Sequence, residues 1–113
     1  MKHNDTKILV IEDSPSQAAV IADIVRQLGH VPVIYNQLSA GITQIVSRER
    51  PQLVLLDLRL LDEDGNQVSD GFQLCREIKR SPLPVPVVVI SAESKEEATE
   101  WAMLQGADGY LQK

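Results

Sequence analysis

The 113-residue sequence has a single cysteine, Cys75, and little positive charge. One cysteine cannot form an internal disulfide, which fits a reducing, cytoplasmic setting. Lysine and arginine together number 11 against 16 acidic residues, so the net charge is −5. Nucleic acid and anionic membranes are bound through a basic footprint, and we therefore expect neither as a direct partner.

Long apolar runs are also missing. No stretch approaches the length of a membrane span, and residues 1–6 lack the apolar core of a secretory signal. There is no internal repeat, and no Cys/His spacing of the kind that binds a structural metal. The length suits one domain with a core large enough to fold alone, so we expect a single domain over residues 1–113.

What is present is an alternation of short aliphatic runs and amphipathic segments. Most of the runs have no polar alternation, which is typical of strands covered on both faces. A weaker run contains Pro32, which indicates a strand at a sheet edge. This alternation predicts an α/β fold with a parallel sheet. The predicted strands cover residues 8–11, 31–35, 53–56, 85–90 and 110–112.

Apolar stripes at helical spacing predict four helices. For the first, Ser14 is the expected cap, Pro15 suits the first helical position, Gln17 stands at capping-box spacing, and Gly29 ends the helix. The second carries Leu38, Ile42, Ile45 and Val46 and ends by Pro51. The third covers Gly71 to Arg80, with Phe72, Cys75 and Ile78 facing inward. The fourth begins at Ser94, with Glu97 at capping-box spacing, and stops at Gly106.

An acidic stretch separates the third strand from the third helix. Residues 62–70 hold four acidic side chains and few apolar ones. Asp64-Gly65 and Asp70-Gly71 are both turn signals. We expect a mobile surface loop that borders the carboxyl end of the third strand.

Polar side chains stand where four of the predicted strands end. Glu12 and Asp13 follow the first strand, Asp57 the third, Ser91 the fourth, and Lys113 the last. The carboxyl ends of parallel strands meet in one crevice, where ligands bind. Three carboxylates brought together there would repel one another without a cation. Mg²⁺ (or Mn²⁺) prefers such oxygen ligands and often shares them with a phosphate, so we expect a divalent-metal site.

The same residues suit phosphoryl transfer. An ionised aspartate can attack phosphorus and form an acyl phosphate. The rest of the work is positioning and charge neutralisation, for which Lys113 offers a cation and Ser91 a hydroxyl donor. Any one acidic residue at a strand end is unremarkable, because strands end in solvent. The joint placement at four strand ends is what favours a site built around Asp57.

Four motifs, in order, resemble the receiver domain of two-component response regulators. The resemblance runs from Thr6 to Lys113, nearly the whole chain. It implies a flavodoxin-like, doubly wound, five-stranded parallel sheet in the order 2-1-3-4-5. The motifs are Ile8 to Pro15 with the acidic pair, Leu55 to Leu58 around the acceptor, Ser91 to Glu93 with the switch hydroxyl, and Gly106 to Lys113 with the switch aromatic and the lysine.

The resemblance also implies roles for particular residues. Asp57 would accept a phosphoryl group from a sensor histidine kinase or a phosphotransfer protein, and Lys113 would contact that group. Ser91 and Tyr110 would form the switch pair that changes binding to a downstream effector domain or target protein. Such a domain carries out only its own phosphorylation and dephosphorylation and is not otherwise an enzyme. The metal would be held by Glu12, Asp13, Asp57 and the backbone carbonyl of Arg59.

Three departures from the family pattern stand out. Leu61 occupies the position of the usual proline, residues 62–69 are an insertion, and the chain stops at Lys113, so the family's fifth helix is absent. The apolar run at 85–90 expects cover on both faces. The uncovered face would expose an apolar patch, so we expect either that the native chain is longer or that a partner, such as a second copy of the chain, covers this face.

Two other functions compete with the switch. A small Mg²⁺-dependent phosphatase with an aspartyl nucleophile would place a second acid two residues after that nucleophile, where this chain has Arg59. A receiver-like interaction module that never uses phosphate would not need the acids, the hydroxyl and the lysine, all of which are present. Both observations favour a phosphorylation-driven switch.

Overall fold

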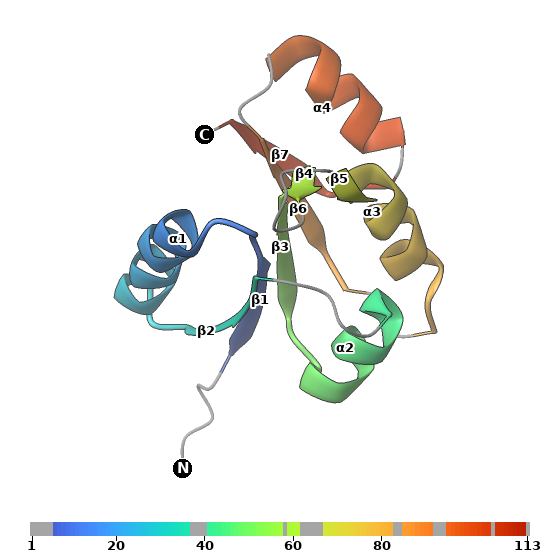
Figure 1. Ribbon diagram of the computed structural model, residues 1–113. Helices are drawn as coiled ribbons and strands as arrows, with labels where there is room; N and C mark the ends of the chain where they lie inside the picture. The colour runs from blue at the N-terminus through green and yellow to red at the C-terminus, as the bar shows by residue number, and fades with distance from the viewer. Residues whose placement is uncertain are drawn as a thin grey trace.

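The computed structural model describes residues 6–36, 41–57, 59–61, 67–82, 85–91, 95–104 and 106–112. Strands and helices alternate along this part of the chain around one parallel sheet (Figure 1). The strands are β1 (Lys7–Ile11), β2 (Val31–Tyr35), β3 (Leu53–Asp57), β4 (Arg59–Leu61), β5 (Gln67–Asp70), β6 (Val87–Ser91) and β7 (Gly109–Gln112). The helices are α1 (Pro15–Gln27), α2 (Ile42–Glu49), α3 (Gly71–Arg80) and α4 (Lys95–Leu104).

The main sheet has five strands in the order β2-β1-β3-β6-β7, and every neighbouring pair is parallel. Counted among the strands of this sheet alone, the order is 2-1-3-4-5, which confirms the predicted flavodoxin-like topology. Pro32 lies in β2 at the edge of the sheet, where its missing N–H costs no ladder hydrogen bond on the open side.

Helices cover the two faces of the sheet unequally. Figure 1 shows α1 on one side and α2, α3 and α4 on the other. The larger core cluster lies on the three-helix side and includes Leu9, Ile45, Ile78 and Val89, all fully buried. On the α1 side, a smaller cluster joins Ile8, Val10 and Val25.

Local signals set the ends of α1 as expected. The Ser14 hydroxyl accepts a hydrogen bond from the Gln17 backbone N–H (3.4 Å), and Pro15 opens the helix. The Ser14 N–H donates to Glu12 Oε2 (3.3 Å), so the acidic residue takes part in the cap. At the other end Gly29 adopts a φ of 88°, which a residue with a side chain rarely adopts.

The remaining helices also follow the predicted stripes. Ile42, Ile45 and Val46 are buried in α2, and Cys75 and Ile78 in α3. Gly106, with a φ of 94°, ends α4 by donating its N–H to the Met103 carbonyl (3.0 Å). The predictions for Leu38, Ser94, and the side chains of Phe72 and Glu97 lie outside the described residues.

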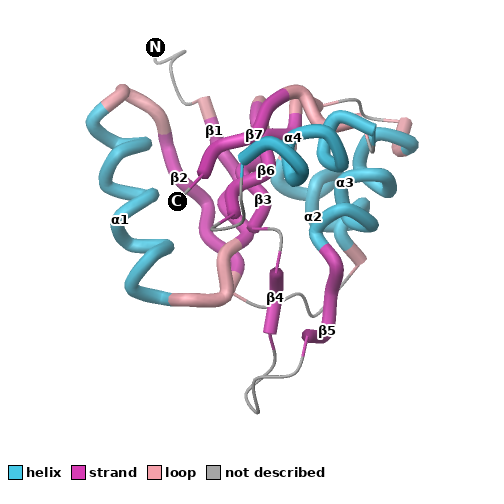
Figure 2. Tube along the Cα trace, turned by 90° about the horizontal axis from the view of Figure 1, so that it is seen from above, coloured by secondary structure: helices cyan, strands magenta, loops and turns pink. Residues whose placement is uncertain are grey.

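The expectation of a mobile loop over residues 62–70 was wrong for its second half. Gln67–Asp70 forms β5, which pairs antiparallel with β4 in a separate two-stranded sheet, with a register shift between Leu60 and Leu61. Figure 2 shows this hairpin standing away from the main sheet. The insertion is long enough for the chain to fold back and satisfy its own backbone hydrogen bonds, which composition alone did not indicate. Residues 62–66 lie outside the described part of the chain.

The fourth strand of the main sheet begins later than predicted, at Val87 rather than Val85. Pro86 has no N–H to donate to a ladder of hydrogen bonds, and its carbonyl accepts from the Val54 N–H (2.9 Å).

None of the described helices has the length and the apolar composition that a membrane span requires.

Candidate functional site

Three carboxylates meet at the carboxyl ends of β1 and β3. One ligand atom from each of Glu12, Asp13 and Asp57 lies within 4.8 Å of the other two. Glu12 is 1% exposed and Asp57 is 6% exposed, while Asp13 is partly open to solvent. The three predicted residues therefore come together in one acidic cluster, in which Asp13 is the member most open to solvent.

The register of the sheet explains this convergence. Ile11 in β1 lies opposite Leu56 in β3, so the next residues, Glu12 and Asp57, are at the same level. Parallel neighbouring strands carry opposed side chains on the same face, which brings the two carboxylates side by side. Asp13 then follows as the chain leaves the sheet toward α1.

Hydrogen bonds to Tyr35, the last residue of β2, and to Asn36, the residue after it, hold the backbone of Glu12. Its N–H donates to the Tyr35 carbonyl (3.1 Å), and its own carbonyl accepts from Asn36 Nδ2 (2.9 Å). The sequence reasoning did not identify Asn36. Its position directly after a predicted edge strand was a weak signal, since asparagine is common in turns.

Ser91 lies at the end of β6 and is 3% exposed. It is one residue beyond Ile90, which pairs with Asp57, so the Ser91 hydroxyl and the Asp57 carboxylate occupy neighbouring strand ends. Tyr110 in β7 pairs with Val89 and packs against the larger core cluster. The structure thus places the predicted switch pair on adjacent strands, Tyr110 being opposite the residue two positions before Ser91.

The donor set fits a hard divalent cation. Three carboxylates offer oxygen ligands alone, and Mg²⁺ prefers oxygen and retains several waters. Two of the three are almost fully buried, where their mutual repulsion is weakly screened and a cation would offset it. The residues present therefore suit Mg²⁺ or Mn²⁺.

Two predicted participants are not tested by these contacts. Arg59 begins β4, two residues after Asp57, and its backbone pairs with Asp70. Its carbonyl as a metal ligand stays a prediction. Lys113 lies outside the described residues, and its contact with a phosphoryl group stays a prediction too.

The sheet order and the acidic cluster at the carboxyl ends of its central strands define a flavodoxin-like α/β domain with a candidate cation site. Comparison with known families identifies the family, because residues 8–113 match the response regulator receiver domain. The chain belongs to this family, the receiver domains of two-component signalling systems.

This chain spans less than half the length of the curated relatives it matches, among which are two regulators of about 30% identity. It is 31% identical over 110 residues to the transcriptional regulatory protein BaeR of Escherichia coli, covering 97% of this chain and 42% of that protein. It is 32% identical over 108 residues to the DNA-binding response regulator MtrA of Mycolicibacterium smegmatis, covering 95% and 43%. The similarity is thus confined to one part of each regulator.

Solved structures give the same fold. The BeF3-activated N-terminal receiver domain of Klebsiella pneumoniae RstA superposes with a TM-score of 0.77 at 27% identity, covering 95% of this chain and 85% of that one. The chemotaxis protein CheY4 of Vibrio cholerae superposes with a TM-score of 0.79 at 18% identity, covering 96% and 87%, which supports the fold alone.

Proposed function

We propose that this domain is a phosphorylation-activated switch whose phosphoacceptor is Asp57. The observation that carries the proposal is the convergence of Glu12, Asp13 and Asp57 within 4.8 Å at the carboxyl edge of the sheet. The donor is a phosphohistidine on a sensor kinase or a phosphotransfer protein, and the readout is altered binding to an effector domain or target protein. Such donors act in the cytoplasm, where we place the domain.

The chemistry assigns a distinct task to each side chain. A carboxylate oxygen of Asp57 attacks phosphorus, an O–P bond forms, and the P–N bond to the donor imidazole breaks, with the electron pair leaving on nitrogen. Glu12 and Asp13, with Asp57, would hold Mg²⁺, which when bound neutralises charge on the phosphoryl oxygens. The Ser91 hydroxyl and the Lys113 ammonium donate to the remaining oxygens.

Replacing Asp57 by asparagine tests the acceptor. The amide keeps the shape of the side chain but is a far weaker nucleophile, so Asp57→Asn should lose the phosphoryl mass gain seen with acetyl phosphate and Mg²⁺. Intact-mass spectrometry measures it, with base lability identifying an acyl phosphate. Asp23→Asn, an exposed α1 carboxylate hydrogen bonded to Gln27, is the matched control. Phosphorylation of Asp57→Asn at the wild-type level would refute the assignment.

Ser91 and Tyr110 are proposed to convert the chemical event into a change of shape. The phosphoryl group draws in the Ser91 hydroxyl, which frees space for the Tyr110 ring to turn inward. A ligand shifts such an equilibrium only by binding one state more tightly, so the phosphoryl mimic must favour the inward state. A beryllofluoride complex examined by NMR or crystallography should show new rotamers for both side chains. Unchanged rotamers would contradict this switch.

A further inference from the structure

We propose that Asn36 is a positioning residue for the metal-binding acids, holding the Glu12–Asp13 peptide in the orientation that cation binding requires. The inference rests on the proposed function, because it concerns the same acidic site. Asn36 contacts the main chain beside the acids in the structure, so its proposed role is that of a positioning residue and not of a ligand. It acts through the backbone of Glu12.

The contact that carries the inference is the 2.9 Å hydrogen bond from Asn36 Nδ2 to the Glu12 carbonyl oxygen. That carbonyl belongs to the peptide group that joins Glu12 to Asp13. A peptide group is planar, so fixing its oxygen also fixes the Cα atoms of both acids. One amide donor thereby restrains the main chain from which two of the three carboxylates that converge within 4.8 Å extend.

Both backbone polar groups of Glu12 are hydrogen bonded to the end of β2 or to the residue that follows it. Its N–H donates to the Tyr35 carbonyl at 3.1 Å, which continues the β1–β2 ladder one step beyond the Ile11–Tyr35 pair. Asn36 adds the complementary contact to the carbonyl. The first bond holds the Ile11–Glu12 peptide group and the second holds the Glu12–Asp13 peptide group, so the backbone is restrained on both sides of the Glu12 Cα where the chain leaves the sheet.

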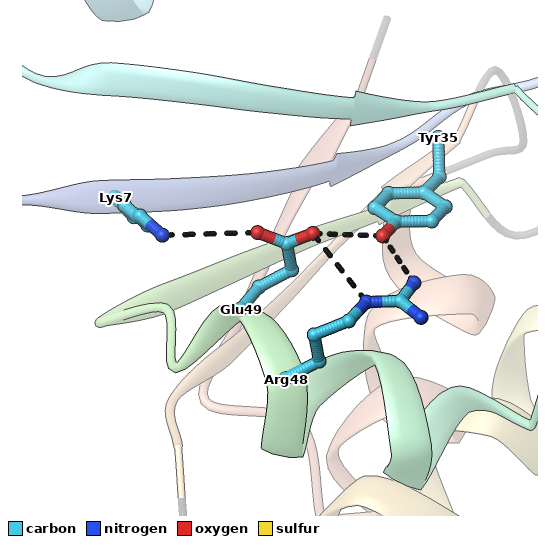
Figure 3. Close-up of polar contacts among 4 residues, drawn as sticks. All are labelled: Lys7, Tyr35, Arg48 and Glu49. Carbon is cyan, nitrogen blue, oxygen red and sulfur yellow. Dashed lines mark hydrogen bonds and ion pairs between the residues drawn. The ribbon is translucent and has the colours of Figure 1, made fainter.

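Asn36 can act as a fixed donor because the end of β2 is itself anchored. Figure 3 shows the Tyr35 ring meeting the end of α2, where its hydroxyl donates to Glu49 Oε2 (2.8 Å) and accepts from Arg48 Nη2 (2.6 Å). Lys7 of β1 reaches the other oxygen of Glu49 (3.8 Å). An edge strand is hydrogen bonded to a neighbour on one side only. These contacts fix Tyr35, its last residue, to α2, and the ion pair joins α2 to β1.

The inference predicts weaker metal binding when the donor is removed. A typical hydrogen bond contributes about 0.5–1.5 kcal/mol, which corresponds to a loss of roughly 2- to 10-fold in Mg²⁺ affinity. Asn36→Ala removes the donor, and Asn36→Leu removes it while keeping side-chain size. Gln27→Ala is the matched control, because Gln27 is also an exposed amide that donates one hydrogen bond, 3.1 Å to Asp23, but on α1.

Calorimetric Mg²⁺ titration of each variant gives the affinity, and phosphorylation by acetyl phosphate at increasing Mg²⁺ gives a second readout. Both Asn36 variants should need more Mg²⁺ for half-maximal rate, reach the wild-type rate at saturation, and melt in EDTA well above the assay temperature, which shows that they are folded without metal. Wild-type Mg²⁺ affinity in both variants would overturn the inference alone, as would an equal loss in Gln27→Ala. Failure of the wild-type protein to bind Mg²⁺ or to modify Asp57 would overturn the proposed function as well.

Discussion

Asp108 links three elements at the end of the sheet opposite the acids. Its Oδ2 accepts from Lys79 Nζ (2.9 Å) at the end of α3 and from the Val87 N–H (2.9 Å) at the start of β6. Lys79 Nζ also donates to the Val85 carbonyl (3.1 Å). The ammonium of Lys79, followed by the Val87 N–H, lowers the pKa of the Asp108 carboxyl below its usual range.

This pKa shift predicts how stability depends on pH. Because the carboxyl has a lower pKa folded than unfolded, its contribution is complete above the unfolded pKa of about 4 and is lost as the pH falls through the folded pKa. Asp108→Asn should therefore destabilise the domain at pH 7 by about 1 kcal/mol, a small value because the carboxylate is half-exposed and screened.

Urea unfolding at pH 7 and at intervals down to pH 2.5 measures the effect. The difference between the wild type and Asp108→Asn should shrink as the acid range is entered. Asp23→Asn, an exposed carboxylate that makes one contact with Gln27, serves as the control for charge removal at the surface. A difference that is constant across the pH range would show that the Lys79 contact does not depend on the charge of Asp108.

Residues were predictable from the sequence when a strand end placed them. Glu12, Asp57 and Ser91 each follow an apolar run directly, and parallel topology brings such positions together. The contacts of Asn36 and of the Lys79–Asp108 pair were not predictable. Each joins residues that are far apart in the sequence, and the helical and strand periodicities that predict elements say nothing about such contacts. Lys79 and Asp108 are 29 residues apart and meet only once α3 and β7 have packed on β6.

At the scale of elements, the β4–β5 hairpin is the feature that separates this chain from the family pattern. It begins two residues after Asp57 and leads directly into α3. Within the described residues its strands pair only with each other. Among the described residues, the three clustered acids come from the carboxyl ends of β1 and β3.

Replacing the hairpin beyond Arg59 by a short turn should therefore leave the chemistry at Asp57 intact, with a rate of phosphorylation by acetyl phosphate close to that of the wild type. Changing a loop length twofold alters the free energy of loop closure by about 0.6 kcal/mol, so the domain should stay folded. Mass spectrometry over time gives the rate, and the melting temperature checks folding. A folded variant with a much lower rate would show that the hairpin helps to form the site.

Element types were predicted better than element ends. Strands and helices followed from aliphatic runs and from stripes at helical spacing, and Ser14 and Gly29 marked the ends of α1. The hairpin was missed because its polar, acidic composition is that of a solvated loop. Pairing between two segments of only three and four residues leaves little mark in the sequence, because so short a run shows no clear alternation of apolar and polar residues.

At the scale of the whole molecule, the face of the sheet that carries α1 is open. A groove of about 650 Å³ runs between α1 and the sheet. Val20, Ile24 and Leu28 lie one helical turn apart on α1 and are 61%, 51% and 68% exposed. Leu111 of β7 is 55% exposed on the far side of the groove. The sequence predicted this exposed apolar patch from the uninterrupted strand at 85–90.

We expect this chain to self-associate through the groove, or to be less stable than the same chain extended by a further helix over it. Covering several hundred Å² of apolar surface at about 25 cal/mol per Å² is worth on the order of several kcal/mol, a large share of a small domain's stability. Sedimentation and thermal melts compare the two chains, and Ile24→Glu should oppose association. A monomer at high concentration that melts as high as the extended chain would contradict the expectation.

The position of α1 gives this groove a second consequence. Ser16 and Gln17 line the groove and stand in the first turn of the helix that follows Asp13. A molecule that binds in the groove and moves α1 would change the affinity of the acids for Mg²⁺. Thermodynamic linkage requires that Mg²⁺ then change the affinity of that molecule by the same factor. The two sites would then be linked, and a change in the apparent Mg²⁺ affinity would show that a molecule had bound in the groove beside α1.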